Sequence, residues 1–296
     1  MSANSADILV TGAAGMTGRL LIPWLGKRGL TVRAMARSEE HAALLQGLGA
    51  DQIVPGDLGD FDSLVEAMQS VSIVHHIPPM MRPDEVQYGN NAIQAACDSG
   101  VKLFSYHSVL HPMLRGMSHH AAKQDVEEAL VLSGLPHVIF QPGQYMQNYL
   151  GMLDSMRSQG IMPITWNPQQ KMGVVDAGDF SEAIANVLAD PQPHIDAIYP
   201  LCGPEALTGD EMANIWSSCL KKPVEAVRVP TDQLQSGLQA AGWPEERIEI
   251  MQRMRSFYDQ HGLPNGNSKV LEHLLTRPPR SYRQFAEETF KSTGNL

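Results

Sequence analysis

The chain has 296 residues, of which 43% are hydrophobic and 18% charged, so a packed globular protein is expected. Acidic residues outnumber basic ones by 32 to 22, and the formal net charge of −10 argues against DNA or RNA as a partner, because nucleic-acid binding needs clustered lysine and arginine. Three cysteines without paired spacing, no signal peptide and no membrane-spanning run predict a cytoplasmic protein.

Short apolar runs alternate with stretches of helical period through the first two thirds of the chain. Runs rich in Val, Ile and Leu with helices between them are typical of right-handed βαβ units and of a parallel sheet covered on both faces. The predicted strands are residues 7–12, 30–37, 51–57, 71–77, 101–108, 136–143 and 197–203. The sequence therefore predicts an α/β fold with a doubly wound parallel sheet, the Rossmann arrangement.

The pattern changes after residue 145. A helix of the sheet domain is still predicted at 178–190, but from about residue 205 helical patterns broken by prolines dominate. We expect a sheet domain of residues 1–145 plus about 176–203. A smaller, mostly helical C-terminal lobe would take 146–175 plus about 204–296.

The segment VTGAAGMTGR, residues 10–19, joins the first predicted strand to the first helix. Its glycines have the spacing of a dinucleotide-binding loop: one turns the chain, one lets backbone approach a pyrophosphate, and one lets the helix pack closely with its N-terminus facing the negative charge. A plain strand–helix turn is the alternative, which the position in the opening βαβ unit disfavours. The expected cofactor contacts in this loop are Thr11, Gly12, Ala14, Gly15, Met16, Thr17 and Gly18.

The end of the second strand indicates which dinucleotide is bound. NAD sites usually place an acid there to accept from the ribose 2′-hydroxyl, whereas this chain has Arg37 and Ser38. A cation suits a 2′-phosphate, so NADP(H) is preferred over NAD(H), although Arg37 could also be a solvated surface residue. After the third strand, Asp57 or the Leu58 backbone is expected to contact the adenine, with a helix N-cap as the other role for Asp57.

Several stretches resemble the NmrA-like family of atypical short-chain dehydrogenase/reductases. They are TGAAGMTGR, VRAMARS, PGDLGD, NNAIQAACDSGVKLFSYHSV, HHAAK, FQPGQYMQN and VDAGDFSEAI, with GPEALTGDEMANIW extending the likeness into the lobe. The resemblance implies an NAD(P)-binding Rossmann domain and a substrate lobe. The family contains reductases of quinones, dyes and azo compounds as well as redox-sensing regulators that bind cofactor without turning it over, so activity stays open.

Ligands of doubly wound sheets bind outside the carboxyl ends of the strands. After the fourth strand, Ile77 and Pro78 are expected to form an apolar ledge beside the cofactor ribose. The resemblance implies that Pro142 and Gly143 let backbone approach the nicotinamide carboxamide, with Tyr145 close behind.

The helix that begins near Ser118 carries the candidate catalytic residues. Lys123 lies at the edge of its buried stripe, where relatives use a lysine toward the nicotinamide ribose; a surface lysine is the alternative. His119 stands four residues earlier, where tyrosine-dependent relatives have their proton donor, and it is either a candidate acid or a helix residue facing solvent. Ser108 matches the serine of those enzymes and Asn91 matches their helix asparagine.

Two neighbouring donors and the remaining histidines are further candidates. Tyr106 and His107 could also donate, but strand alternation places them on opposite faces of the sheet. Adjacent histidines on a strand are poor geometry for a shared ion, and no Cys or carboxylate spacing completes a ligand set. No metal site is predicted.

The first interpretation is an NADPH-dependent oxidoreductase that transfers hydride to a mid-sized conjugated or aromatic acceptor, such as a quinone, enone or dye. A non-catalytic NADP(H)-binding redox sensor and a non-redox enzyme that retains the dinucleotide are the alternatives. The expected partners are a small-molecule substrate and, as an option, a second copy in a homodimer; no membrane partner is expected. The substrate pocket is expected around Tyr145, Met146, Asn148, Trp166 and Trp243.

Overall fold

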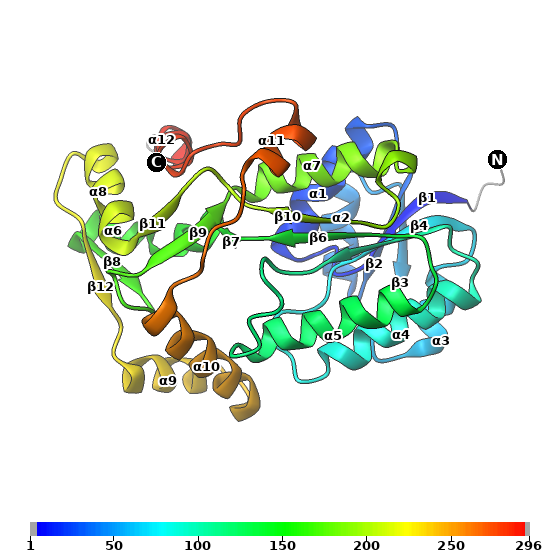
Figure 1. The fold of residues 1–296 in the computed structure, drawn as a ribbon, viewed down its shortest axis with the longest axis horizontal. Coiled ribbons are helices and arrows are strands. Elements are labelled where there is room, and N and C mark those ends of the chain that lie inside the picture. The colour runs from blue at the N-terminus through cyan, green and yellow to red at the C-terminus, as the bar shows by residue number, and fades with distance from the viewer. Residues whose placement is uncertain (1–4, 294–296) are drawn as a thin grey trace. The chain divides into compact units, whose positions relative to one another are not determined.

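The computed structural model describes residues 5–293, which form two compact units (Figure 1). The first unit runs to Leu114 and resumes over His119–Gln141 and Phe180–Pro200. The second unit takes Arg115–Ser118, Pro142–Asp179 and the chain from Leu201 onward. The assignment of one domain to the dinucleotide and of a lobe to the substrate stays a prediction.

The first unit is built on a seven-stranded sheet with the order β10-β6-β5-β4-β1-β2-β3. Strand β1 pairs in parallel with β2 on one side and with β4, the central strand, on the other, and the pairs β2–β3, β4–β5 and β5–β6 are also parallel. All seven strands coincide with predicted ones: β1 Ala6–Val10, β2 Val32–Ala36, β3 Gln52–Pro55, β4 Val71–His76, β5 Leu103–His107, β6 His137–Pro142 and β10 Ala197–Leu201. The predicted doubly wound Rossmann fold is confirmed, and its strand order reverses at β1 and β4, where such sheets bind ligands.

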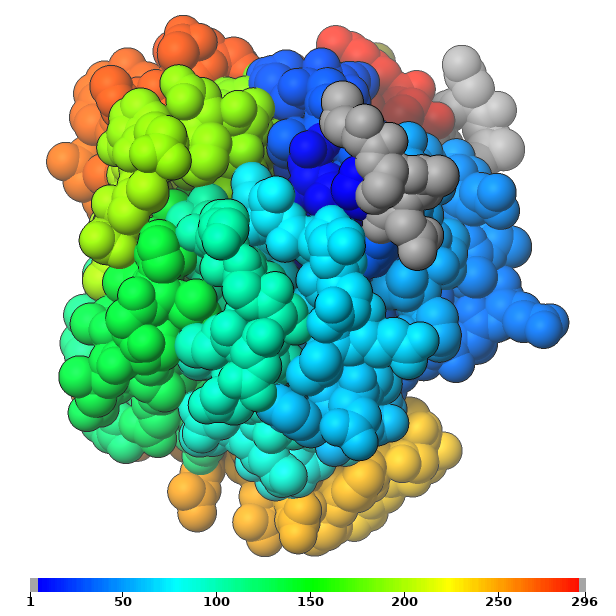
Figure 2. Space-filling view, turned by 90° about the vertical axis from the view of Figure 1, so that its right-hand side faces the viewer, coloured from blue at the N-terminus to red at the C-terminus, as the bar shows by residue number. Residues whose placement is uncertain are grey.

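Helices cover both faces of this sheet (Figure 1). Those of one face are α3 Phe61–Ala67, α4 Glu85–Asp98 and α5 Ser118–Leu132, which share a buried apolar core with β1, β4, β5 and β6. Those of the other face include α1 Met16–Lys27, α2 Glu39–Gly47 and α7 Ala177–Ala189. Arg28 at the end of α1 donates to Asn186 of α7 over 2.7 Å. Figure 2 looks onto the edge where the strands begin, and the colour passes from blue through cyan to green across it as the sheet order requires.

The second unit is mostly helical, as predicted, but it also contains two small sheets. One has the order β11-β9-β7 and the other pairs β12 with β8 in parallel. Its strands are β7 Gln144–Tyr145, β8 Ile161–Ile164, β9 Lys171–Val175, β11 Ala206–Thr208 and β12 Glu225–Arg228. Its helices are the 3-10 helix η1 Met146–Met152, α6 Leu153–Gln159, α8 Gly209–Leu220, α9 Thr231–Ala240, α10 Glu245–His261, α11 Lys269–Leu275 and α12 Tyr282–Thr293.

Two sets of hydrogen bonds fix helices α8 and α12 of the second unit. A capping box starts α8: the Thr208 hydroxyl accepts from the Glu211 N–H (3.1 Å), and the Glu211 carboxylate accepts from the Thr208 N–H (2.8 Å). Trp216 of α8 then donates its indole N–H to the Tyr282 hydroxyl of α12 over 3.1 Å, and both rings are buried. Within residues 5–293, no helix combines the length and apolar character needed to cross a membrane.

Candidate functional site

The loop between β1 and α1 leaves no space for a side chain at its first glycine. Gly12 has φ of +59°, and a Cβ there would lie 2.4 Å from the backbone oxygen of Ile77, directly after β4. Both the left-handed conformation and this close backbone approach require glycine. The loop is thereby packed against the segment that follows β4, at the sheet's switch point.

The third glycine brings α1 against the same loop. A Cβ on Gly18 would lie 2.3 Å from the backbone oxygen of Ala13. The helix begins at Met16 after Gly15 as N-cap, and among the described residues no side chain caps it and no acid lies in its first turn. Its first backbone N–H groups are therefore free of side-chain partners, and together with the helix dipole they fit a pyrophosphate.

Thr11 ties the carboxyl ends of β1 and β4 together. Its backbone N–H donates to the His75 carbonyl (3.1 Å), and its hydroxyl accepts from the Ile77 N–H (3.1 Å). The same hydroxyl lies within hydrogen-bond distance of His76 Nδ1, at 2.9 Å. Thr11 is buried, and its hydroxyl serves this internal network.

After β2, Arg37 is exposed and Ser38 serves the next helix. The Ser38 hydroxyl accepts from the His41 N–H (3.2 Å) as the N-cap of α2, with Glu39 and Glu40 in the first turn. Ser38 is thus committed to the helix, and the Arg37 guanidinium is the group at this strand end that suits a 2′-phosphate.

The loop after β3 is fixed by its own polar groups. Asp57 accepts from the Gly59 N–H (2.8 Å), and the helix N-cap of α3 is Asp60. Of the two roles open to Asp57, capping is therefore wrong, because Asp60 takes that position. Asn91 of α4 donates to the Leu58 carbonyl over 3.0 Å and anchors the loop.

Lys123 of α5 points inward and is paired. Its ammonium lies 2.6 Å from a carboxylate oxygen of Glu85, the first residue of α4, and the two side chains are 12% and 1% exposed. The same ammonium lies 5.9 Å from the centre of the Tyr106 ring. Glu85 was not predicted from the sequence, because nothing in the pattern of α4 marks its first acidic residue as a buried ion-pair partner.

Ser108 contacts a second carboxylate that was not predicted from the sequence. Its hydroxyl donates to Glu127, which also accepts from the Gln141 side-chain amide (2.9 and 3.1 Å). Burial raises the pKa of Glu127, and the hydrogen bonds from Ser108 and Gln141 oppose that rise. The available signal is the spacing, since Glu127 follows Lys123 by four residues on α5.

His119 lies half-buried at the start of α5, with its ring edge-on to His120 at 4.6 Å. Burial, helped by His120 and by the charge of Lys123, holds the pKa of His119 well below its usual 6.5. The ring is therefore neutral near pH 7. It can offer an N–H to a ligand, but it is not a charged acid.

Tyr106 and His107 face opposite sides of the sheet, as alternation predicts. Tyr106 stacks on His76 at 5.9 Å with a 12° angle between the rings. His107 meets Phe180 edge-on at 4.9 Å. Only Tyr106 shares a face with Lys123.

Pro142, Gly143 and Tyr145 lie in the second unit. Pro142 and Gly143 are buried, and the Gly143 N–H donates to the Leu201 carbonyl over 3.0 Å. Burial raises the pKa of Tyr145 well above 10. In the first unit, Ile77 and Pro78 are buried after β4.

The side chains expected to line a substrate pocket do not share one environment. Met146 and Trp166 are buried in the second unit, and Asn148 is exposed. Trp243 is half-buried beneath the Arg247 guanidinium, 3.7 Å from the ring centre.

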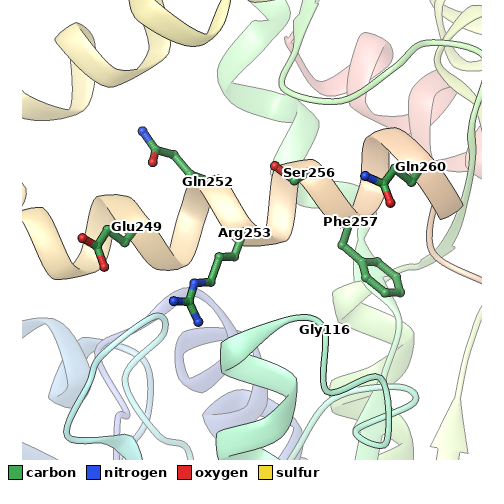
Figure 3. Close-up of a pocket in the computed structure, with 7 residues that line it drawn as sticks. All are labelled: Gly116, Glu249, Gln252, Arg253, Ser256, Phe257 and Gln260. Atoms are coloured by element: carbon green, nitrogen blue, oxygen red, sulfur yellow. The ribbon is translucent and has the colours of Figure 1, made fainter.

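A cavity of about 640 Å³ in the second unit lies along α10 (Figure 3). It is lined by Gly116, Glu249, Gln252, Arg253, Ser256, Phe257 and Gln260. No sequence pattern marked this face of α10, because its polar residues look like an ordinary solvated helix face. Among the described residues, no group of three His, Cys, Asp or Glu side chains could hold a metal ion.

The chain matches the family model described as "NmrA-like family" over residues 4–287. It is 29% identical over 287 residues to NAD(P)H azoreductase of Xenophilus azovorans, covering 95% of this chain and 96% of that protein. Among solved structures, it is similar to the NADPH complex of the Escherichia coli quinone oxidoreductase QOR2 and to the triphenylmethane reductase of Citrobacter sp. Each has a TM-score of 0.82 and 24% identity, over 96% of this chain and 99% of the other. The family match spans nearly the whole chain, and this protein belongs to the NmrA-like family.

Proposed function

We propose that the protein is an NAD(P)H-dependent oxidoreductase that reduces conjugated acceptors of the quinone, enone or dye type. The observation that carries the proposal is the glycine loop, which is packed on backbone at Gly12 and Gly18 and opens onto an α1 N-terminus without side-chain caps in the described chain. The names of the relatives, an azoreductase and reductases of quinones and triphenylmethane dyes, support the acceptor class.

The residues present fit the dinucleotide. The first turn of α1 would hold the pyrophosphate, Arg37 a 2′-phosphate, and Lys123 the nicotinamide ribose. Pro142, Gly143 and Tyr145 would lie against the nicotinamide, which supplies the hydride when bound.

The side chains of this site suit acceptors that need no strong acid. His119 is neutral near pH 7, and the Ser108 hydroxyl is already engaged by Glu127. A quinone or a dye accepts hydride directly, and water can protonate the product. The protein then contributes mainly by positioning the reactants and excluding competing reactions.

The test is oxidation of NADPH by the purified protein with naphthoquinone, an azo dye, a triarylmethane dye and a simple enone, followed at the nicotinamide absorbance band. We expect turnover with at least one of them and unchanged rates in His119→Phe. Tight NADPH binding without oxidation by any acceptor would contradict the proposal and favour a redox sensor. Product formation without any change in nicotinamide absorbance would favour a non-redox enzyme.

Lys123→Met should lower turnover by about a hundredfold, because the ribose loses the group that positions it. The change also leaves Glu85 as an unpaired carboxylate that is 1% exposed, so we expect about 3–5 kcal/mol of destabilisation. Adding Glu85→Gln removes that buried charge. The double variant should regain thermal stability without regaining turnover, and recovery of both would show that Lys123 acts only through the fold.

Arg37→Ser should weaken NADPH binding about tenfold, which corresponds to one charge-assisted hydrogen bond, and leave NADH binding unchanged. Titration of each nucleotide by calorimetry measures the difference. Lys102→Ser is the matched control, since it removes an exposed cation just before β5, where the strands begin. Equal loss for both nucleotides would remove Arg37 as the 2′-phosphate contact.

A further inference from the structure

The ammonium of Lys123 has a second neighbour besides Glu85. It lies over the ring of Tyr106, 5.9 Å from the ring centre. The Lys123 side chain is 12% exposed, and Tyr106 is fully buried. The face of an aromatic ring attracts a cation at this distance, and the attraction is stronger away from water. The ammonium is therefore held from two elements, by the carboxylate on α4 and by the ring on β5.

Helices α4 and α5 approach each other closely beside this contact. A Cβ on Gly89 of α4 would lie 2.6 Å from Cγ2 of Val126 on α5, so a larger residue would force the helices apart. Glu85 lies one turn before Gly89, and Lys123 lies three residues before Val126. The close packing thus brings the two charged side chains together at the start of both helices.

Tyr106 is itself held against the strand that leads to the dinucleotide loop. His76 is its register partner in the β4–β5 pair, and the two rings stack at 5.9 Å with an angle of 12°. His76 Nδ1 lies 2.9 Å from the hydroxyl of Thr11, which begins that loop. A chain of contacts therefore runs from the dinucleotide loop through the two rings to the ammonium of Lys123.

The ring of Tyr106, and not its hydroxyl, makes these contacts. Within residues 5–293 the buried hydroxyl has no hydrogen-bond partner. Phenylalanine would keep the ring at this position, and methionine would fill much of the space without one. Lys123 donates one of its three N–H groups to Glu85, which leaves two that can donate to the hydroxyls of a ribose.

We propose that Tyr106 is a positioning residue whose ring holds the ammonium of Lys123 toward the nicotinamide ribose. This inference rests on the proposed function, which assigns Lys123 to that ribose. Because Tyr106 is fully buried, it acts through Lys123 and not on the dinucleotide itself. Without the ring, the long lysine side chain keeps its ion pair but loses one of the two contacts that define its position.

Binding is tested by calorimetry with NADPH and with adenosine 2′,5′-bisphosphate, which lacks the nicotinamide ribose. Tyr106→Met should weaken NADPH binding about fivefold, the size of a partly desolvated cation–π contact, and leave the bisphosphate unaffected. Tyr106→Phe should bind both ligands like the wild type. In the Lys123→Met background, Tyr106→Met should cause no further loss of NADPH affinity, because the ring acts through the ammonium.

Phe104→Met is the matched control. Phe104 lies two residues earlier on β5, is equally buried in the same apolar core, and has its ring 6.0 Å from that of His76. The ammonium of Lys123, however, lies over the Tyr106 ring. Urea denaturation should show a similar loss of stability in the two methionine variants, whereas only Tyr106→Met should lose affinity for NADPH.

Turnover with naphthoquinone gives a second measure. In Tyr106→Met, kcat should fall about fivefold with KM for naphthoquinone unchanged, and Tyr106→Phe should restore it. An equal loss of NADPH affinity in Phe104→Met or in Tyr106→Phe, or an equal loss for the bisphosphate, would overturn the inference. A failed proposed function looks different: no acceptor oxidises NADPH, yet NADPH affinity still depends on the ring at position 106.

Discussion

Gly12→Ala is expected to abolish NADPH binding and to lower the free energy of unfolding by more than about 3 kcal/mol. Two costs add at this position. Alanine in a left-handed conformation costs about 1–2 kcal/mol, and the new Cβ would lie 2.4 Å from the Ile77 backbone oxygen. Because that oxygen belongs to the segment directly after β4, relief of the clash must move the loop away from the sheet's switch point. The dinucleotide loop would then lose the shape that fits a pyrophosphate.

Alanine substitutions at two other glycines distinguish the conformational cost from the steric cost. Gly49 has φ of +96°, but nothing lies within 4 Å of a Cβ added there, so Gly49→Ala carries the conformational cost alone. Gly26 lies inside α1 with ordinary dihedrals and open space, so Gly26→Ala should be neutral or stabilising. Urea denaturation and NADPH titration of the three variants check the order. If Gly12→Ala were no worse than Gly49→Ala, or still bound NADPH normally, the close approach to Ile77 would have no role.

The sheet could be predicted from the sequence because parallel strands buried on both faces are continuous apolar runs. Segments such as residues 7–12 and 71–77 differ from their amphipathic neighbours for that reason, and β1 and β4 lie there. The short strands of the second unit carry no such signal. β8 and β12 have four residues each, and their pairing joins segments about sixty residues apart.

The sequence indicates those parts of the candidate site that depend on local geometry. It does not indicate the parts that depend on tertiary contacts. Spacing alone indicates the glycine loop, and helix capping explains why Ser38 differs from Arg37. Glu85 and Glu127 belong to the candidate site because they are buried and paired with residues of other elements. Glu85 pairs with Lys123, and Glu127 accepts hydrogen bonds from Ser108 and Gln141. For Glu85 no pattern within a single helix contains that information, and for Glu127 the only local signal is its spacing from Lys123 on α5.

The buried histidines form a group whose chemistry the sequence also did not reveal. His75, His76, His107 and His120 are all buried in the first unit. Burial is the main cause that lowers the pKa of His75 and His76 to about 3 and of His120 to about 4, and it holds the pKa of His107 well below 6.5. The charge of Lys123 lowers the pKa of three of them further. In the unfolded chain each would return to an ordinary pKa near 6.5.

Acidification is therefore expected to unfold the protein near pH 5. Below pH 6.5 the histidines bind protons in the unfolded chain but stay neutral in the folded protein. The free energy of unfolding therefore falls until the folded pKa values of about 3 to 4 are reached. Each histidine costs up to about 1.4 kcal/mol per pH unit once its unfolded form is protonated, and about half of that at pH 6.5, so four of them remove about 6 to 7 kcal/mol between pH 6.5 and pH 5. That is comparable to the whole stability of a typical domain. Glu127 has the opposite sign, because its raised pKa favours the folded state as pH falls, but it is one group against these four histidines and His119.

Urea denaturation at a series of pH values between about 7.5 and 5 measures this slope. His75→Gln, whose amide can replace the imidazole contact with Ser105 (2.7 Å), should reduce the slope by about 1.4 kcal/mol per pH unit. His273→Gln, at an exposed position of α11, should leave the slope unchanged. A stability that is flat from pH 7 to pH 5 would mean that the buried imidazoles are protonated in the folded state, which is incompatible with their apolar surroundings. In that case His119, whose pKa the same burial lowers, would again be a candidate acid.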